Sequence, residues 1–342
     1  MKRLTASAPT RIDLAGGTLD IWPINMLVSR ALTVNVAIDL RATTLIEDLP
    51  SGVYGASARK EIHSEDQGVS ETWDSGSSPP AATKLPLIGE CVRFFEAERG
   101  FKLTTRCAAP AGSGLGGSSA LAISLVGGLR AFLGRPTMPP EDMVLVARDL
   151  EARVLGIPTG TQDHFAAAFG GAMAIRYGAG PPVREPLHVD LDALGERLVL
   201  AYSGASRQSG RANWDMMRRA MEGERTTRDA LESIASIAHE MRSALRAADL
   251  DAAGALLGRE WEQRRKLSDM VTTPAIEKAL ETARAAGAIA GKACGAGGGG
   301  CVAFLCRAGA RPAVERALAG LESDGVRPLA ARPTRVGLEL AG

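Results

Sequence analysis

Cysteine is scarce in this sequence, net charge is almost absent and no long apolar run occurs, and each shortage excludes a class of protein. The 342 residues contain five cysteines, an odd number without the paired spacing of a disulfide framework, so we expect a reduced, cytoplasmic setting. The net charge of +1 provides no overall attraction to nucleic acid or to an anionic membrane. No apolar run approaches the length of a membrane span, and the first residues lack the apolar core of a secretory signal. We therefore expect a cytoplasmic protein that binds neither nucleic acid nor membrane.

Zinc ligands in a recognisable spacing are also missing. Cys294, Cys301 and Cys306 lie near one another, but no histidine is close and the spacing matches no zinc pattern. A metal site and three small buried side chains remain open as interpretations, and the sequence favours the second.

The chain does have enough length and apolar content for two packed units. Its 342 residues exceed the usual size of one core, and 45% hydrophobic and 23% charged residues are typical of a globular protein. A segment rich in glycine and proline at 178–186 is the best candidate for a junction, and 68–84 is expected to be a loop. Strands are expected at 31–47 and 101–108, and a long helical tract at 211–286, so the predicted class is α+β with two mixed sheets.

Glycine is concentrated in two runs, and the first lies between an expected strand and an expected helix. Residues 112–119 hold four glycines and three serines, and leucines follow at helical spacing. Unpaired N–H groups at a helix N-terminus favour an anion, and glycines let the backbone close around it. The hydroxyls of Ser118 and Ser119 can bind phosphate oxygens or Mg²⁺, or can cap the helix. The segment therefore predicts a phosphate site.

Two other glycine motifs and a purely structural turn are the alternatives for this segment. Gly112, Gly114 and Gly117 have the spacing of the dinucleotide fingerprint, but a proline-rich turn and a helix stand where that motif needs an acidic residue on a second strand. Gly291 and Lys292 lack the first glycine and the hydroxyl residue of a Walker A loop. A glycine-rich turn kept for tight packing stays open.

Three segments resemble, in order and spacing, the three motifs of the GHMP kinases, the family of galactokinase, homoserine kinase and mevalonate kinase. They are APTRIDLAGGTLD at 8–20, PAGSGLGGSSA at 110–120 and KACGAGGGGCVAF at 292–304. The resemblance covers nearly the whole chain. It implies the GHMP kinase fold, with an N-terminal ribosomal-protein-S5-like, nucleotide-binding domain over 1–182 and a C-terminal ferredoxin-like α/β domain over 183–342.

Within the family, further segments resemble the bacterial sugar kinases that act on D-glycero-D-manno-heptose 7-phosphate. These segments are EARVLGIPTGTQDHFAAAFGG at 151–171, LAYSGASRQSG at 200–210 and GREWEQRRKLS at 258–268. The resemblance implies ATP and Mg²⁺ as cofactors and phosphorylation of the anomeric (C1) hydroxyl of a sugar or sugar phosphate. Residues 16–20 read Gly-Gly-Thr-Leu-Asp, where heptose kinases usually read Gly-Gly-Gly-Thr-Asp. The resemblance favours D-glycero-D-manno-heptose 7-phosphate as the substrate, and fucose, galactose and a uronic acid are the alternatives that this departure leaves open.

The resemblance also assigns the reacting groups. Asp163 matches the catalytic aspartate that takes or orients the proton of the attacking hydroxyl, and Arg11 matches a basic residue that would hold Asp163 ionised. Ser118 and Glu151 match the Mg²⁺ ligands of the family, and their oxygen atoms are the kind of ligand that this cation prefers. From position alone, Asp163 could instead cap a helix, Arg11 could be a surface charge and Glu151 an ordinary exposed helical residue. The nucleotide is expected to bind Pro110, Gly112, Ser113, Gly114, Leu115, Gly116, Gly117, Ser118 and Ser119.

The sugar is expected to contact residues of several segments. Asp20 matches an aspartate that holds sugar hydroxyls, and the guanidinium group of Arg207 suits a phosphate. The second glycine run, at 295–300, is expected to pack beside the first and to shape the site near the phosphates. The predicted substrate-binding set is Gly16, Gly17, Thr18, Asp20, Gln162, Arg207, Gly297 and Gly298.

A catalytically silent binding protein of the same fold is the competing function. The presence of Asp163, Ser118, Glu151 and both glycine runs argues against it, because a silent protein has no chemical need for them. The expected partner is a small-molecule sugar or sugar phosphate, and the protein could be a monomer or a homodimer.

Overall fold

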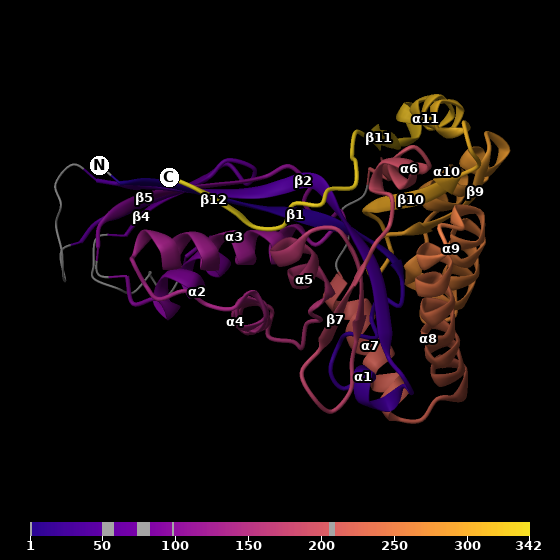
Figure 1. The fold of residues 1–342 in the computed structure, drawn as a ribbon, viewed down its shortest axis with the longest axis horizontal. Coiled ribbons are helices and arrows are strands. Elements are labelled where there is room, and N and C mark those ends of the chain that lie inside the picture. The colour runs from indigo at the N-terminus through magenta and orange to yellow at the C-terminus, as the bar shows by residue number, and fades with distance from the viewer. Residues whose placement is uncertain (1, 50–57, 74–82, 98, 205–208) are drawn as a thin grey trace.

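A computed structural model describes residues 2–49, 58–73, 83–97, 99–204 and 209–342, the last of these without the side chains of 209–212. Two units lie side by side, each built on its own β-sheet (Figure 1). Of the described helices, none combines the length and the apolar composition that a membrane span requires.

The larger sheet has eight strands in the described part of the chain, with the central order β12-β1-β2-β5-β3-β4. Its two longest strands pair antiparallel over nearly their whole length, because both alternate β-branched or other apolar residues with polar ones. The expected strand at 31–47 is confirmed as β2, whereas part of the expected loop at 68–84 is strand β4. The strands are β1 (Arg3–Ala15), β2 (Leu32–Asp48), β3 (Lys60–Ser64), β4 (Val69–Trp73), β5 (Phe101–Cys107), β6 (Ala172–Arg176), β7 (Val183–Leu187) and β12 (Glu339–Ala341).

Helices cover one face of this sheet (Figure 1). The central one, α3, is buried along most of its length, and its Gly128 lets the helix approach the sheet, since a Cβ there would lie 3.1 Å from Ala6 Cβ. The short α1 (Ile24–Leu27) connects β1 to β2. The covering helices are α2 (Pro86–Phe94), α3 (Gly117–Phe132), α4 (Pro140–Leu155) and α5 (Gln162–Phe169).

The second unit is a four-stranded antiparallel sheet in the order β11-β8-β10-β9, packed against helices. In chain order the fourth strand therefore lies beside the first and the third beside the second, which is the ferredoxin-like arrangement and confirms the expected fold class. Its strands are β8 (Leu198–Tyr202), β9 (Ala288–Ala293), β10 (Cys301–Cys306) and β11 (Arg327–Leu329). Its helices are α6 (Leu191–Gly195), α7 (Ser209–Met221), α8 (Arg225–Arg246), α9 (Leu250–Arg265), α10 (Pro274–Ala285) and α11 (Arg311–Ala319), with 3₁₀ turns η2 (Asp269–Val271) and η3 (Glu322–Asp324).

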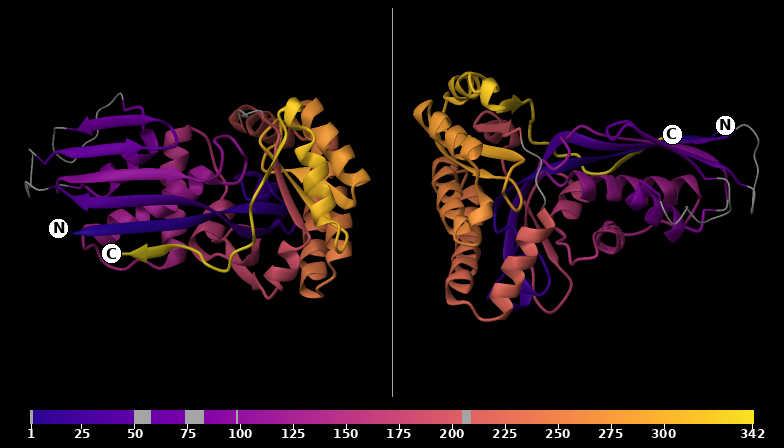
Figure 2. Two further views of the ribbon diagram at one scale, coloured as in Figure 1. Left: turned by 90° about the horizontal axis from the view of Figure 1, so that it is seen from above. Right: turned by 180° about the vertical axis from the view of Figure 1, so that it is seen from behind.

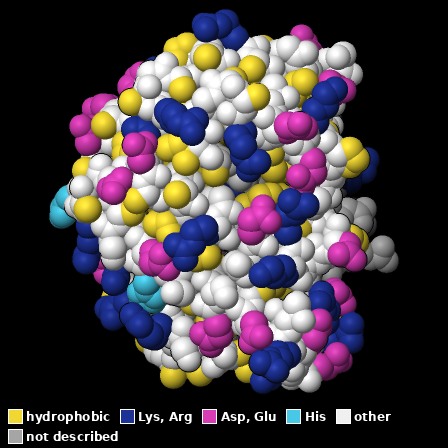
Figure 3. All heavy atoms as spheres, turned by 90° about the vertical axis from the view of Figure 1, so that its right-hand side faces the viewer, with side chains coloured by type: hydrophobic (Ala, Val, Ile, Leu, Met, Phe, Trp, Pro, Cys, Tyr) yellow, Lys and Arg dark blue, Asp and Glu magenta, His cyan; other side chains and the backbone are white. Residues whose placement is uncertain are grey.

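The larger sheet takes strands from both sides of the predicted division at residue 182. β7 follows that position and pairs antiparallel with β6, so the division lies within a hairpin. The chain then crosses to the second unit and returns, and β12 pairs with β1 (Figure 2). On the face that carries the second unit, basic and acidic side chains are interspersed (Figure 3), which fits the small net charge.

Candidate active site

A cleft of about 660 Å³ lies where the end of β1, the first glycine run and the start of α5 meet. Most of its wall comes from the first unit, but Asn213, Gly295 and Ala296 of the second unit also line it. The cleft is of the size that binds a small molecule. A site at this junction therefore depends on both units.

The first glycine run forms an open cradle on this wall. Gly112, Gly114 and Gly116 all have positive φ, between 69° and 79°, which side chains disfavour. The N-cap of α3 is Gly116 in the left-handed conformation, so the expected cap by Ser118 or Ser119 is wrong. A Cβ at Gly116 would lie 3.0 Å from Asp163 Cβ, which means that the cradle and this aspartate are in direct contact.

The second glycine run packs against the first, as expected. Cys301 N donates to Ser113 O at 2.7 Å. A Cβ at Gly300 would lie 2.5 Å from the same carbonyl oxygen, so only glycine allows this approach. The two runs therefore form one continuous backbone surface.

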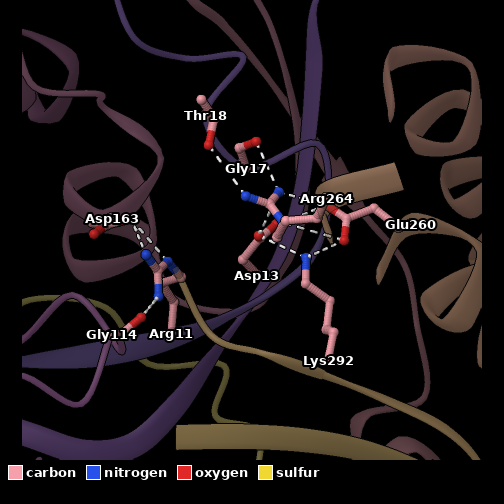
Figure 4. Close-up of polar contacts among 9 residues, drawn as sticks. All are labelled: Arg11, Asp13, Gly17, Thr18, Gly114, Asp163, Glu260, Arg264 and Lys292. Atoms are coloured by element: carbon pink, nitrogen blue, oxygen red, sulfur yellow. Dashed lines mark hydrogen bonds and ion pairs between the residues drawn. The ribbon is translucent and has the colours of Figure 1, made fainter. Parts of the chain in front are cut away.

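Arg11 and Asp163 form an ion pair on the floor of the cleft. Arg11 Nε and Nη2 lie 2.8 and 2.6 Å from Asp163 Oδ1, and Arg11 Nη1 donates to Gly114 O at 2.6 Å (Figure 4). Burial alone would lower the pKa of Arg11, but the charges of Asp163 and Asp13 and the hydrogen bond to Asp163 together outweigh it and raise that pKa. Arg11 is only 3% exposed, which excludes a surface charge, and Asp163 makes no helix-cap hydrogen bond.

Asp20 is a second carboxylate of the cleft, close to the first. Its Oδ2 accepts a hydrogen bond from Gln162 N at 3.1 Å. Gly160 allows this approach, because a Cβ there would lie 1.8 Å from Asp20 Oδ2. Burial and the charge of Asp163 raise the pKa of Asp20 to about 6.

Glu151 lies at the end of α4, behind the start of α3. Ser119 Oγ donates to Glu151 Oε2 at 2.8 Å, and His164 Nε2 lies 3.0 Å from the same oxygen. Burial alone would raise the pKa of Glu151, but His164 and the hydroxyls of Ser118 and Ser119 lower it. The buried Glu151 is therefore an ionised oxygen donor beside two hydroxyls, and not an ordinary exposed residue of a helix.

Glu151 and the two serine hydroxyls are too few to hold a metal ion by themselves, but they suit Mg²⁺, which takes its other ligands from water and phosphate. Among the described residues, no group of three or more His, Cys, Asp or Glu side chains could hold a metal ion. Mg²⁺ commonly takes one or two protein oxygens and completes its shell with water and phosphate. Cys294, Cys301 and Cys306 are buried within the apolar cores.

The structure brings most of the predicted residues to the cleft. Gln162 and three residues of the loop at 16–20, Gly17, Thr18 and Asp20, line it, whereas Gly16 does not. All of the predicted nucleotide residues line it except Leu115, which is buried in the core. Gly297 and Gly298 lie outside the lining, although Gly295 and Ala296 of the same run belong to it, and Arg207 falls outside the described residues.

Sequence reasoning missed a cluster of buried charges behind Gly17 and Thr18. Its members are Asp13, Glu260, Arg264 and Lys292. A lysine within the apolar strand at 288–293 and a Glu–Arg pair four residues apart on a helix were the available signals.

Two family models match the chain. The model of the GHMP kinases N terminal domain matches residues 86–171, and that of the GHMP kinases C terminal matches residues 241–322. The N-terminal model includes the first glycine run and α5, and the C-terminal model includes α9 and the second glycine run.

Individual relatives agree with these models. The chain is 27% identical over 317 residues to the D-glycero-alpha-D-manno-heptose 7-phosphate kinase of Campylobacter jejuni, covering 89% of this chain and 90% of the relative. It is 25% identical to the bifunctional fucokinase/GDP-fucose pyrophosphorylase of Arabidopsis thaliana, covering 90% of this chain and 30% of that protein. The crystal structure of a D-glycero-D-manno-heptose 1-phosphate kinase from Bacteroides thetaiotaomicron superposes with a TM-score of 0.79 at 26% identity, covering 99% of both chains.

These relatives are ATP-dependent kinases and include sugar kinases, so the expected enzyme class is confirmed. The matching fold, the cradle of glycines and the neighbouring Arg11–Asp163 pair agree with that class. The chain belongs to the GHMP kinase family.

Proposed function

We propose that the protein transfers a phosphoryl group from ATP to the anomeric (C1) hydroxyl of a sugar or sugar phosphate. The observation that carries this proposal is the Arg11–Asp163 pair, which lies between the glycine cradle and Asp20 in one cleft. D-glycero-D-manno-heptose 7-phosphate is the first substrate to test, because a relative with this named activity matches over most of both chains. Fucose is the second, since a fucokinase is also among the relatives.

Asp163 is assigned to the acceptor hydroxyl. Phosphoryl transfer requires an oriented nucleophile and neutralised charge, and little covalent work falls to the protein. Arg11 binds one carboxylate oxygen of Asp163 twice, so it holds the side chain in one rotamer. The other oxygen, Asp163 Oδ2, is then available to accept the hydrogen of the attacking hydroxyl.

The glycine cradle is assigned to the phosphates of ATP. Backbone N–H groups at the start of α3 and the helix dipole both favour negative charge there. Glu151 with Ser118 or Ser119 would hold Mg²⁺, since these oxygens lie together and Glu151 is ionised. When bound, Mg²⁺ supplies charge neutralisation at the phosphates.

The sugar is assigned to the part of the cleft that Asp20 and Gln162 line. Asp20 and Gln162 offer acceptors and donors for hydroxyl groups, and Thr18 lies beside them. Gly297 and Gly298 belong to the second glycine run and are assigned an indirect role, in which that run shapes the cleft near the sugar. Arg207 remains the predicted contact of a sugar phosphate.

The test is a substrate panel incubated with ATP and Mg²⁺. The panel holds the heptose 7-phosphate, fucose, galactose and glucuronic acid, with ADP release as the first readout. Phosphorus NMR of the product then reports whether phosphate is attached at C1. Binding of a non-hydrolysable ATP analogue without turnover of any sugar would favour the silent binding protein and overturn the proposal.

A further inference from the structure

Four buried charged side chains form a closed cluster behind the substrate loop, residues 16–20 (Figure 4). Asp13 comes from β1, Glu260 and Arg264 from α9, and Lys292 from β9, and each is at most 2% exposed. Lys292 Nζ lies 2.8 Å from Asp13 Oδ2 and 3.0 Å from Glu260 Oε2. Arg264 Nη2 lies 2.5 Å from Glu260 Oε1. Two carboxylates and two cations make the cluster neutral.

Stability alone does not account for this cluster. Removing four charges from water is costly, and well-packed apolar side chains in place of buried ion pairs are often as stable or more so. Burial would raise the pKa of Asp13, but the charges of Lys292, Arg264 and Arg11 together outweigh it and lower that pKa, so the carboxylate is ionised. The cluster therefore keeps real charges in the interior, at the place where the two units meet.

Arg264 has donors beyond those that Glu260 uses, and they reach the substrate loop. Arg264 Nη2 donates to Gly17 O at 2.9 Å, and Nη1 donates to Thr18 Oγ1 at 3.2 Å. The contact is close, because a Cβ at Gly17 would lie 2.2 Å from Asp13 Oδ2. The backbone of the loop thus rests directly on the charge cluster.

The substrate loop has a conformation that needs such support. Thr18 has φ of +82°, a left-handed conformation that is strained for a β-branched residue. The turn is closed by hydrogen bonds from Leu19 N to Gly16 O and from Ile21 N to Thr18 O, both 3.1 Å. This turn determines where Asp20 lies in the cleft.

We propose that Arg264 is a positioning residue of the sugar site. Glu260 fixes its guanidinium group, which holds Gly17 and Thr18 in the strained turn and thereby places Asp20. The inference rests on the proposed function, because that function assigns Asp20 to the sugar. Arg264 makes no contact with the glycine cradle among the described hydrogen bonds, so its loss should change sugar binding and leave nucleotide binding intact.

The first test is kinetic and uses Arg264→Lys, which keeps the cluster neutral but cannot supply the planar fork of donors. We expect the KM for the sugar to rise about tenfold or more, the usual effect of losing hydrogen bonds to a charged group. The kcat and the KM for ATP should change little. The matched control is Arg259→Lys on the same helix, which pairs with Glu240 at the surface and should leave all three constants unchanged. An equal rise in both KM values, or an unchanged sugar KM, would overturn the inference.

The second test is hydrogen exchange without any substrate. The amides of Leu19 and Ile21 should exchange about tenfold faster in Arg264→Lys than in the wild type, because their turn loses its support. If Arg264→Lys does not fold, Thr18→Val takes its place in the test. It removes one acceptor of Arg264 but leaves all four charged side chains, and it should accelerate the exchange of the same amides. Unchanged exchange in the folded variants overturns the inference. If the wild type phosphorylates no sugar, the proposed function fails, and exchange alone then decides whether Arg264 holds the loop.

Discussion

In the proposed reaction, Asp163 is the residue on which the chemistry depends most directly. The isosteric Asp163→Asn removes the charge and the proton acceptor, while Arg11 keeps its bond to Gly114 O. We expect turnover to fall by about 10²–10⁴-fold, the usual contribution of a general base, with binding of an ATP analogue changed only a few-fold. Asp149→Asn, at an exposed position of α4, is the control for both measurements. Unchanged turnover would remove Asp163 from the mechanism.

The raised pKa of Asp20 predicts how sugar turnover should depend on pH. Its pKa is raised to about 6, so the carboxylate is ionised and accepts hydrogen bonds above that pH, and is protonated below it. We expect kcat/KM for the sugar to fall about tenfold per pH unit below this pKa, as for one essential group. In Asp20→Asn this part of the profile should be flat and low. A wild-type profile that is level from pH 7.5 to 5 would contradict the assignment of Asp20 to the sugar.

The same pKa has the opposite effect on folding. An aspartate whose pKa is raised in the folded state binds more protons there than when unfolded, so its contribution to stability decreases as pH rises from about 4 to about 6. If Asp20 binds the sugar as proposed, substrate binding is therefore favoured above about pH 6, whereas the contribution of Asp20 to stability is greater at lower pH. A buried carboxylate kept for binding carries such a cost.

The residues of the family motifs could be predicted from the sequence, but the buried charged residues that pack behind them could not. Arg11 and Asp163 are 152 positions apart, and only the resemblance to a family indicated that they meet. No such pattern linked Asp13 with Lys292, which are separated by 279 positions. A buried ion pair leaves no periodic signal, because each partner is a single charged residue on a different element.

Among the elements, the second glycine run offers a clear test. Gly300 has φ of +79°, and a Cβ there would lie 2.5 Å from Ser113 O, so Gly300→Ala must move the two runs apart. We expect the KM for ATP to rise about tenfold and the protein to lose about 1–3 kcal/mol of stability from strain. Gly309→Ala is the matched control, since its φ is +74° but nothing lies within 4 Å. Equal kinetic effects in both variants would mean that contact between the runs is not needed.

Helices were more predictable than strands for a physical reason. The helical tract at 211–286 divides near Gly223, Asp249 and Pro274, because glycine, a capping aspartate and proline act locally. Strand β4 was mistaken for a loop because it is short and precedes a segment rich in Ser, Gly and Pro. Strand β12 has only three residues and depends on pairing with β1 at the other end of the chain.

The two units are joined so extensively that they should behave as one in unfolding. β7 and β12 belong to the larger sheet although they follow the predicted division, and the buried cluster ties α9 and β9 to β1. Opening the contact between the units while Asp13 stays buried would leave its charge without Lys292, which is costly. Opening of one unit should therefore destabilise the other.

We accordingly expect a single transition in calorimetry, both without ligand and with a non-hydrolysable ATP analogue and Mg²⁺. At about 100 times its Kd, the analogue should add about 2.7 kcal/mol of stability through binding to the folded state alone. This corresponds to a rise in Tm of a few degrees for a chain of this size. The control is the same scan with matched salt and Mg²⁺ but no nucleotide. Two transitions, of which the analogue moves only one, would show that the units fold independently and that the cleft belongs energetically to the first unit alone.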